Sequence, residues 1–463
     1  NSSGHMMWMQ QYGSAGDDAA NDIAVSSAGS LVVCGSTSGS FSGFSNNGGA
    51  DALLIVSNEI APTAAPTAAP SAQPTPEPTP HPSAAPTHVP SLAPQASPTH
   101  VPSAAPTASP TAVSVLISQT GSAAFDSFAG LVVDSQKNMY VSGSTEGSLF
   151  GPHVGGQDVV FAKYDEFGSL LFSKQFGSAA NDYSRAVAVD SAGNTILGGS
   201  TFGSISGASA GGADVFLRKY SSAGAVVSTI QFGSAGDDQL FSLAMDSSDN
   251  LYLAGSTAGS LQGSNAGGTD AFLRKYDSSG QVVFTKQFGT AGDDSADWVV
   301  VDTSGNIFVG GSTSSALVGA SAGHDDVYLR KYNSAGVEQF TVQFGTSGMD
   351  RAESCALDSN GDVYVAGYTN GSFAGAQNAG DFDGFLVKYS SAGSLVFARQ
   401  EGTAAVDKFT SVAVTNADEV YAVGVTMGSF AKASAGGSDI IATKFNSSGH
   451  MMWMQQYGSA GDD

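Results

Sequence analysis

The sequence predicts an all-β protein in which seven similar units, each of four short strands, form the blades of a β-propeller. Three observations lead to this prediction: a repeat of about 56 residues, strand-like alternation within each repeat, and a composition rich in glycine and poor in charge. The 463-residue chain contains 59 glycines, and 13% of its residues are charged. Such a composition favours many tight turns between short strands over helices.

The repeat is located by a glycine that follows a glutamine and one further residue. From Gly121 to Gly458 this marker glycine recurs at steps of 56, 56, 56, 56, 57 and 56 residues. Between Gly13 and Gly121 the step is 108 residues, so one repeat carries an insert of about 52 residues. Self-similarity at a fixed period of this length indicates a repeat architecture.

Each repeat contains the pattern of four strands. In residues 239–289, QLFSLAMD alternates polar and apolar residues as a half-buried strand does, and the turn SSDN follows it. LYLAGST, TDAFLRKY and QVVFTKQFG have the composition of three further strands, separated by a glycine-rich loop and a second turn. Four antiparallel strands in a unit of this length predict one propeller blade.

The unit GSTxGSxxGxxAGGxDxFLxKYxSxGxxxxxxQFG, as it stands in residues 255–289, resembles the seven-bladed β-propeller repeat family often called SBBP. The resemblance covers every unit except the insert. It implies a fold rather than a reaction, because the family is defined by its repeats. The second strand of each unit carries GST, GYT or GVT and occurs seven times, which predicts a ring of seven four-stranded blades.

Residues 62–110 form a proline-rich insert within the first blade. Proline recurs every four residues from Pro62 to Pro110, in thirteen tetrapeptides of the form P-[ST]-x-x with one glutamine at the Ser/Thr position. Because proline fixes φ and removes backbone donors, the segment cannot form helix or sheet. We expect a polyproline-II rod of roughly 150 Å, at about 3.1 Å per residue. A bare flexible loop is the alternative.

The regular hydroxyl residues of the insert suggest that the rod is coated with O-linked sugars. Ser/Thr-Pro tracts are typical of O-glycosylated stalks. The candidate O-glycosylation sites are Thr63, Thr67, Ser71, Thr75, Thr79, Ser83, Thr87, Ser91, Thr99, Ser103, Thr107 and Thr111.

The first eighteen residues, NSSGHMMWMQQYGSAGDD, recur letter for letter as residues 446–463. If the linker 60–112 is a straight rod, residues 1–59, with the first three strands of blade one, and residues 113–463 belong to different propellers. Neighbouring copies would then be joined head-to-tail, in one tandem polypeptide or through donated strands. The alternative is a single ring with a decorated loop, in which two identical strands compete for one position.

An aspartate stands five residues after each marker glycine. Residues repeated in every blade are expected to be structural, because one active site needs one set of residues. Their expected role is to accept backbone N–H groups in tight turns, and the six residues assigned to it are Asp126, Asp182, Asp238, Asp294, Asp350 and Asp407. Calcium binding by pairs such as Asp237–Asp238 and Asp293–Asp294 is the alternative, although EF-hand spacing is absent.

The net charge and the motifs that are missing from the sequence argue against several classes of function. A net charge of −24 predicts no binding to nucleic acid or to anionic membranes. No apolar run reaches the roughly 20 residues of a membrane span. No zinc motif, nucleophile elbow or phosphate loop occurs, so we expect neither an enzyme nor a cofactor. The triplets at Asn1, Asn370 and Asn446 allow N-linked glycans in a secreted protein.

These observations together predict an extracellular or cell-surface structural protein. It would be a subunit of a glycosylated filament, with copies of itself and glycans as its partners. The alternative is a secreted or cell-surface propeller that binds a carbohydrate or a protein and carries a glycosylated loop.

Overall fold

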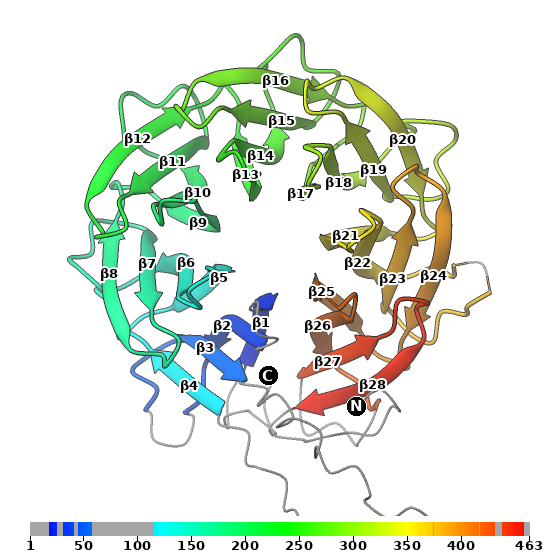
Figure 1. Ribbon diagram of the computed structural model, residues 1–463, viewed down its shortest axis with the longest axis horizontal. Coiled ribbons are helices and arrows are strands. Elements are labelled where there is room, and N and C mark those ends of the chain that lie inside the picture. Colours follow the sequence, from blue (N-terminus) through cyan, green and yellow to red (C-terminus); the bar gives the residue numbers. More distant parts are fainter. Residues whose placement is uncertain are drawn as a thin grey trace, which may run out of the picture.

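The computed structural model describes residues 18–25, 31–40, 45–57, 115–373, 375–415, 417–430 and 438–457. These residues form seven antiparallel sheets of four strands, set as blades around a central channel (Figure 1). No helix occurs among them. The prediction of an all-β, seven-bladed propeller with four-stranded blades is confirmed.

We number the blades in chain order, so that β1–β4 form blade one and β25–β28 form blade seven. The innermost strands are β1 (Asp18–Val25), β5 (Asp126–Val133), β9 (Asp182–Val189), β13 (Asp238–Met245), β17 (Trp298–Val301), β21 (Asp350–Leu357) and β25 (Asp407–Val414). The second strands are β2 (Leu31–Thr37), β6 (Met139–Thr145), β10 (Thr195–Thr201), β14 (Leu251–Thr257), β18 (Ile307–Thr313), β22 (Val363–Thr369) and β26 (Val420–Thr426).

The third strands are β3 (Asp51–Ser57), β7 (Asp158–Tyr164), β11 (Asp214–Tyr220), β15 (Asp270–Tyr276), β19 (Asp326–Tyr332), β23 (Asp383–Tyr389) and β27 (Asp439–Phe445). The outer strands are β4 (Val115–Thr120), β8 (Leu170–Phe176), β12 (Val226–Phe232), β16 (Val282–Phe288), β20 (Glu338–Phe344), β24 (Leu395–Glu401) and β28 (Met451–Tyr457). Successive strands pair within each blade, and the outer strand lies on the circumference (Figure 1).

In blade one, the strands on either side of the insert lie next to each other. Strand β3, before the insert, pairs with β4, after it, from Ala52↔Thr120 to Ser57↔Val115. The two sides of the insert therefore meet in one sheet of one ring, rather than belonging to different propellers as a straight rod would require. A long loop can close in this way because its entropic cost grows only with the logarithm of its length. The predicted polyproline-II rod itself lies outside the described residues.

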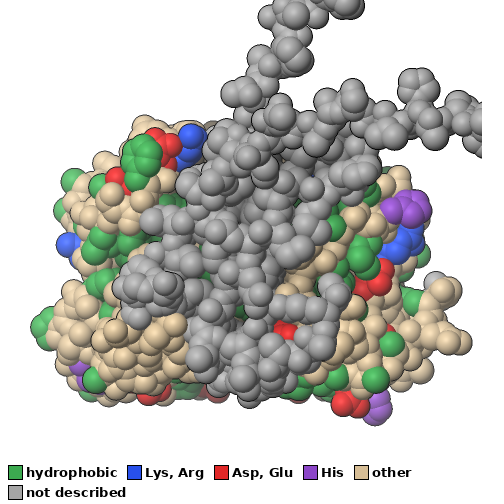
Figure 2. All heavy atoms as spheres, turned by 90° about the horizontal axis from the view of Figure 1, so that it is seen from below, with side chains coloured by type: hydrophobic (Ala, Val, Ile, Leu, Met, Phe, Trp, Pro, Cys, Tyr) green, Lys and Arg blue, Asp and Glu red, His purple; other side chains and the backbone are tan. Residues whose placement is uncertain are grey.

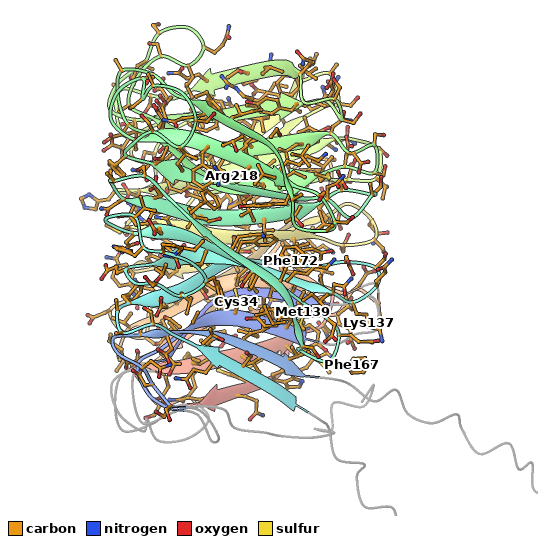
Figure 3. All side chains as sticks on the ribbon, turned by 90° about the vertical axis from the view of Figure 1, so that its left-hand side faces the viewer. Cys34, Lys137, Met139, Phe167, Phe172 and Arg218 are labelled. Carbon is orange, nitrogen blue, oxygen red and sulfur yellow. The ribbon has the colours of Figure 1, made fainter. Side chains whose placement is uncertain are left out.

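The apolar core is divided among the interfaces between blades. Seven buried clusters are found in the described residues, and each joins side chains of two neighbouring blades. Cys34 of β2 and Met139 of β6, both labelled in Figure 3, lie in the cluster between blades one and two. Because every cluster needs two blades, no blade can bury its apolar surface alone.

Cation–π contacts reinforce three of these interfaces. The guanidinium of Arg218, labelled in Figure 3, lies 3.8 Å from the ring centre of Phe176 in the preceding blade. The same contact measures 3.9 Å between Arg274 and Phe232 and 4.1 Å between Arg330 and Phe288. Such contacts stabilise by about 0.5–2 kcal/mol each. The repeat therefore fixes the interface between blades as well as the blade itself.

The face seen in Figure 2 shows few charged side chains where it is uncovered. In the part of the surface that Figure 2 leaves uncovered, uncharged groups predominate and acidic or basic ones occur singly or in small groups. Within the described residues, no helix is long and apolar enough to cross a lipid bilayer.

Candidate functional site: the mouth of the central channel

The glycine of the GST motif produces an irregularity in every innermost strand. Gly199 of β10 lies so close to β9 that a Cβ atom at this position would overlap the carbonyl oxygen of Tyr183. Gly255 stands in the same relation to Gln239, and Gly367 to Arg351. Only glycine allows two backbones to approach in this way. The close approach lies beside a β-bulge, at which one residue of the innermost strand has no partner.

The bulge directs the unpaired side chain into the channel. In six blades it falls three residues after the innermost aspartate, as at Arg185 between Ser184↔Gly199 and Ala186↔Gly198. In blade five, residues 295–297 interrupt the strand, and Asp297 occupies the corresponding place. Bulges often re-aim side chains near binding sites. The seven channel residues, one per blade, are Asn21, Ala129, Arg185, Phe241, Asp297, Glu353 and Thr410.

These seven channel residues are of seven different types, although the blades that carry them share one repeat pattern. They line a cavity of about 960 Å³ at the channel mouth, together with polar residues from blades four to six. A ring of identical side chains would offer a ligand seven equivalent orientations, whereas this ring offers one. The channel mouth is therefore the part of the propeller best suited to selective recognition.

Charges of both signs face this cavity. Arg351 on blade six is paired with Asp325, with 2.9 Å between Nη2 and Oδ2. The guanidinium of Arg185 lies 5.7 Å from the ring centre of Phe241. Neither Arg185 nor Glu353 has a hydrogen bond or an ion pair with any residue in the described ranges. The guanidinium of Arg185 and the carboxylate of Glu353 act on each other electrostatically, and the hydrogen-bonding atoms of both can bind a ligand.

Burial perturbs two of the carboxyl groups that line the mouth. The pKa of Asp297 is raised to about 6, chiefly by burial and in smaller part by the neighbouring Glu353, against the hydroxyls of Ser295 and Ser312, which lower it. Burial also raises the pKa of Glu353, against the opposing effect of Lys408, Arg351 and Arg185. Perturbed titratable groups in a cleft are typical of functional sites.

A second ring of side chains lies one residue further along the innermost strands and joins adjacent blades. Ser242 Oγ accepts the N–H of Val299 in the next blade at 3.3 Å, and Ser354 Oγ accepts that of Val412 at 3.2 Å. In blade one Asp22 takes this place. Its carboxylate accepts the N–H of Leu131 at 3.0 Å and the hydroxyl of Ser411 at 3.2 Å. Asp22 therefore contacts the blades on both of its sides.

The repeated aspartates lie where the turn leads into each innermost strand, and one of them, Asp294, also lines the cavity at the channel mouth. Asp182 Oδ2 accepts the backbone N–H of Ser178 at 2.5 Å and its hydroxyl at 3.0 Å. The same pair of bonds joins Asp350 to Thr346 and Asp407 to Thr403. Asp126, Asp238 and Asp294 likewise accept the N–H of the residue four positions earlier. Each of these carboxylates thus accepts a hydrogen bond from the backbone of the preceding turn.

The marker glycine is explained by two aspartates that close around it. A Cβ atom on Gly177 would overlap Oδ1 of Asp158 and would come within 2.9 Å of Oδ2 of Asp182. Asp158 begins the third strand of blade two, and Asp182 begins the innermost strand of blade three. Both aspartates are fully buried. The glycine of the Gln-x-Gly motif therefore lies where buried aspartates of two successive blades pack against the same backbone.

The calcium alternative stays a prediction. Asp293 Oδ1 accepts the N–H of Thr269 at 2.9 Å, and Asp237 Oδ1 accepts that of Ala213 at 2.9 Å. Within the described ranges, no group of three or more His, Cys, Asp or Glu side chains is arranged to hold a metal ion.

The candidate glycosylation sites are placed as follows. All twelve O-glycosylation candidates of the insert, and Asn1, lie outside the described residues. Asn370 is exposed, and its Oδ1 accepts the N–H of Met349 at 2.6 Å. Asn446 is half-buried in the turn before β28, where its Oδ1 accepts the N–H groups of Ser448 and His450 at 3.0 and 2.9 Å. The structure thus offers Asn370 as the more accessible of the two.

The channel residues were not predicted from the sequence, because they occupy a position at which residue types differ from blade to blade. Two signals were present in the sequence: an isolated glycine within each second strand, which indicates a bulge or close backbone approach, and variability three residues after each innermost aspartate.

Comparisons with known proteins agree with the fold of the repeat. The β-propeller repeat family SBBP matches residues 283–317 and 339–374, which confirms the resemblance for those repeats. The regulatory protein FlaEY of Caulobacter vibrioides is 32% identical over 170 residues, which are 33% of this chain and 18% of that protein. An uncharacterized WD repeat-containing protein of Acanthamoeba polyphaga mimivirus is 26% identical over 136 residues, 26% of this chain and 10% of that protein.

The chain thus spans less than a fifth of the length of either curated relative. Among solved structures, Sqt1 from Chaetomium thermophilum superposes with a TM-score of 0.47 at 12% identity, covering 94% of this chain and 83% of that one.

Proposed function

We propose that this chain is a binding module and that its ligand, a carbohydrate or a peptide, is held at the mouth of the central channel. The observation that carries the proposal is the ring of seven channel residues, which are all of different types although the innermost aspartate and the glycine of the second strand recur in every blade. A purely structural channel needs no such asymmetry. In this proposal the protein is not an enzyme, and it acts by recognition.

The chemistry of the mouth supports a polar ligand. Phe241 offers an aromatic face on which a sugar ring or an apolar side chain can stack. Arg185, Glu353 and Asp297 offer a planar cation and two carboxylates for hydroxyl, amide or charged groups. A cavity of about 960 Å³ lies at the upper end of the range of ligand pockets, which run from about 300 to 1,000 Å³. This volume accommodates several sugar or amino-acid units.

The test is a binding screen with matched variants. Immobilised oligosaccharides and a peptide library would be probed with the wild-type chain, and the Kd of each hit would be measured by calorimetry. We expect Arg185→Gln and Glu353→Gln each to weaken binding at least about tenfold, since each removes a charge-assisted hydrogen bond worth roughly 1.5–3 kcal/mol. Both side chains face solvent in the channel, so the fold should be unaffected.

Glu166→Gln serves as the control for Glu353→Gln. Glu166 lies outside the channel and is paired with Lys137 at 3.0 Å, so its loss should leave the Kd unchanged. Ligands that bind wild type and the Arg185→Gln/Glu353→Gln double variant with equal affinity would disprove the channel as the site.

As a second function we propose a glycosylated, extracellular filament subunit. The observation that favours it is the eighteen-residue identity of residues 1–18 with 446–463, because a tandem array of copies would repeat the chain with a period of 445 residues. Residues 60–112 would then serve as a sugar-coated spacer. Mass spectrometry of the peptide 61–112 and electron micrographs test this proposal: an unmodified mass, or discrete discs in place of fibres, would reject it.

A further inference from the structure

A second cavity lies on the face of the ring opposite the channel mouth. The innermost strands of blades two to four begin near the mouth, and their last residues line this cavity together with the turns that follow them. Lys137, in the turn after β5, lies at this face of the ring in Figure 3. The volume is about 640 Å³, within the range of about 300–1,000 Å³ for small-molecule sites. The propeller therefore has a cavity on each face.

One lysine of this cavity lacks the partner that its counterparts have. In six blades the sixth residue of the third strand is a lysine. Five of these lysines contact an oxygen at 2.8–3.1 Å, and the pairs are Lys219 with Asp190, Lys275 with the carbonyl of Ser334, Lys331 with the carbonyl of Ser391, Lys388 with Asp358 and Lys444 with Glu419. The sixth is Lys163 of β7, which lines the cavity and has no hydrogen bond or ion pair with any described residue. Its three N–H donors thus lack an acceptor.

The missing partner of Lys163 has a local cause. In blade three the lysine binds an aspartate of its own blade. The corresponding atom of blade two, Asp134 Oδ2, already accepts the side-chain amide of Asn138 at 2.8 Å and the hydroxyl of Tyr140 at 2.9 Å. Blade three has Ile196 in place of this tyrosine. The ammonium of Lys163 instead lies over the Tyr140 ring, 4.8 Å from its centre.

Uncharged hydrogen-bonding groups line the same cavity. The side chains of Ser135, Gln136, Ser222 and Ser247 are exposed there and make no hydrogen bond with any residue in the described ranges. Between them lie half-buried apolar residues at the ends of the three innermost strands. Hydroxyl and amide groups beside apolar carbon match the surface of a sugar, which has hydroxyls on its edge and C–H groups on its faces.

The charges around the cavity argue against an ionic ligand. Four aspartates line it, and they are Asp134, Asp190, Asp246 and Asp249. Their field repels an anion. A simple cation offers no acceptor to Lys163, and the carboxylates already have partners, as where Asp249 accepts the N–H and the hydroxyl of Ser191 at 2.8 and 2.6 Å. A neutral ligand with several hydroxyl groups satisfies both conditions.

We propose that this cavity is a binding site for a neutral saccharide, in which a ring or hydroxyl oxygen of the sugar accepts a hydrogen bond from Lys163. The serine hydroxyls and the amide of Gln136 bind further hydroxyls of the same sugar. The site is separate from the channel mouth and does not require a ligand there.

Calorimetry with matched lysine variants tests the site. The probes are maltohexaose, cellohexaose, mannohexaose and xylohexaose, and we expect at least one to bind the wild-type chain. Lys163→Met should weaken that binding at least about tenfold, since a charge-assisted hydrogen bond is lost. Because Lys163 has no hydrogen bond to lose and methionine keeps an unbranched side chain over Tyr140, the melting temperature should be unchanged. Lys331→Met, the same change in blade five, should leave the Kd unchanged.

The channel double variant Arg185→Gln/Glu353→Gln separates this site from the one at the mouth. Saccharide binding should persist in it with the wild-type Kd. Binding that is lost in the channel variant and kept in Lys163→Met would place the sugar at the mouth and overturn the proposal. The absence of binding by all four saccharides would also overturn it, as would Lys163-dependent binding of an uncharged peptide, such as a Gly-Ser hexamer, in their place.

Discussion

Asp22 shows how one side chain can depart from the repeat and alter the pH response of the ring. The structurally equivalent positions of blades four, six and seven carry serine, and Ser242 and Ser354 each accept an N–H from the next blade. Asp22 makes the same kind of contact but brings a carboxylate into a half-buried place. Burial raises its pKa from the ordinary 3.8 to about 6, despite the hydrogen bonds from Ile23, Leu131 and Ser411 that lower it.

The raised pKa predicts that Asp22→Ser stabilises the protein at neutral pH. Between pH 4 and 6 the folded state keeps a proton on Asp22 that the unfolded state has lost, so the stability contributed by Asp22 falls as pH rises through this window. Above about pH 6 the ionised carboxylate costs up to roughly 3 kcal/mol. In urea unfolding, the free energy of unfolding of Asp22→Ser relative to that of wild type should therefore increase from pH 4.5 to 7.5.

The matched control for this measurement is Ser354→Ala, which removes the equivalent contact without a titrating group. It should cost about 1 kcal/mol at every pH. A stability difference between Asp22→Ser and wild type that is constant from pH 4.5 to 7.5 would contradict the assigned pKa.

At the scale of the element, a single glutamine ties each outer strand to the loop before the third strand. Gln231 Oε1 accepts the N–H groups of Ile205 and Ser206 at 2.9 and 3.0 Å. Its Nε2 donates to the carbonyl of Gly203 at 2.9 Å and to Oδ2 of buried Asp214 at 2.8 Å. Equivalent bonds are made by Gln175, Gln287 and Gln343. The recurring Gln-x-Gly motif thus has a structural cause.

We expect Gln231→Ala to destabilise the propeller by about 2–4 kcal/mol, because it removes the partners of several backbone groups and one donor to a buried carboxylate. Gln281→Ala is the control, since Gln281 is exposed at the start of an outer strand and should change stability by less than about 0.5 kcal/mol. Guanidinium unfolding of both variants measures the difference in stability. Equal unfolding midpoints for the two variants would show that the hydrogen bonds of Gln231 contribute nothing to stability.

The same element shows what sequence reasoning could and could not predict. In residues 239–289 the four predicted strands match β13 to β16 within one residue at each end, because the alternation and the turns repeat seven times and reinforce one another. The bulge was not predicted. One unpaired residue reverses the phase of a period-two pattern, but the paired segments on either side of it in β13 are three and four residues long, too short to show the reversal. The pairing of β3 with β4 within one chain agrees with the single-ring alternative, and composition did not decide between the two because it describes the stiffness of the insert but not the pairing of its flanking strands.

At the scale of the whole molecule, we expect blade one to be the least stable part of the ring. It is interrupted by the insert, and its interface with blade seven has the smallest buried cluster among the described residues. That interface also depends on polar contacts, from Thr410 Oγ1 to the carbonyl of Ala20 at 3.3 Å and from Ser411 Oγ to Asp22 at 3.2 Å. Because each apolar cluster joins two blades, loss of blade one would expose surface on both neighbours.

The pairing of β3 with β4 predicts that the insert can be removed without loss of the ring. Ser57 and Val115 are register partners, so an Asn-Gly dipeptide in place of residues 58–114 would form a two-residue hairpin turn. Shortening the loop should stabilise the ring by up to about 3 kcal/mol, since less chain entropy is lost on closure. Light scattering should find both proteins monomeric at low concentration, and the shortened chain should melt at a higher temperature. If the full-length chain instead associates through exchanged β3 and β4 strands, only the shortened protein will be monomeric, and blade one would then be shown to form between chains whenever the insert is present.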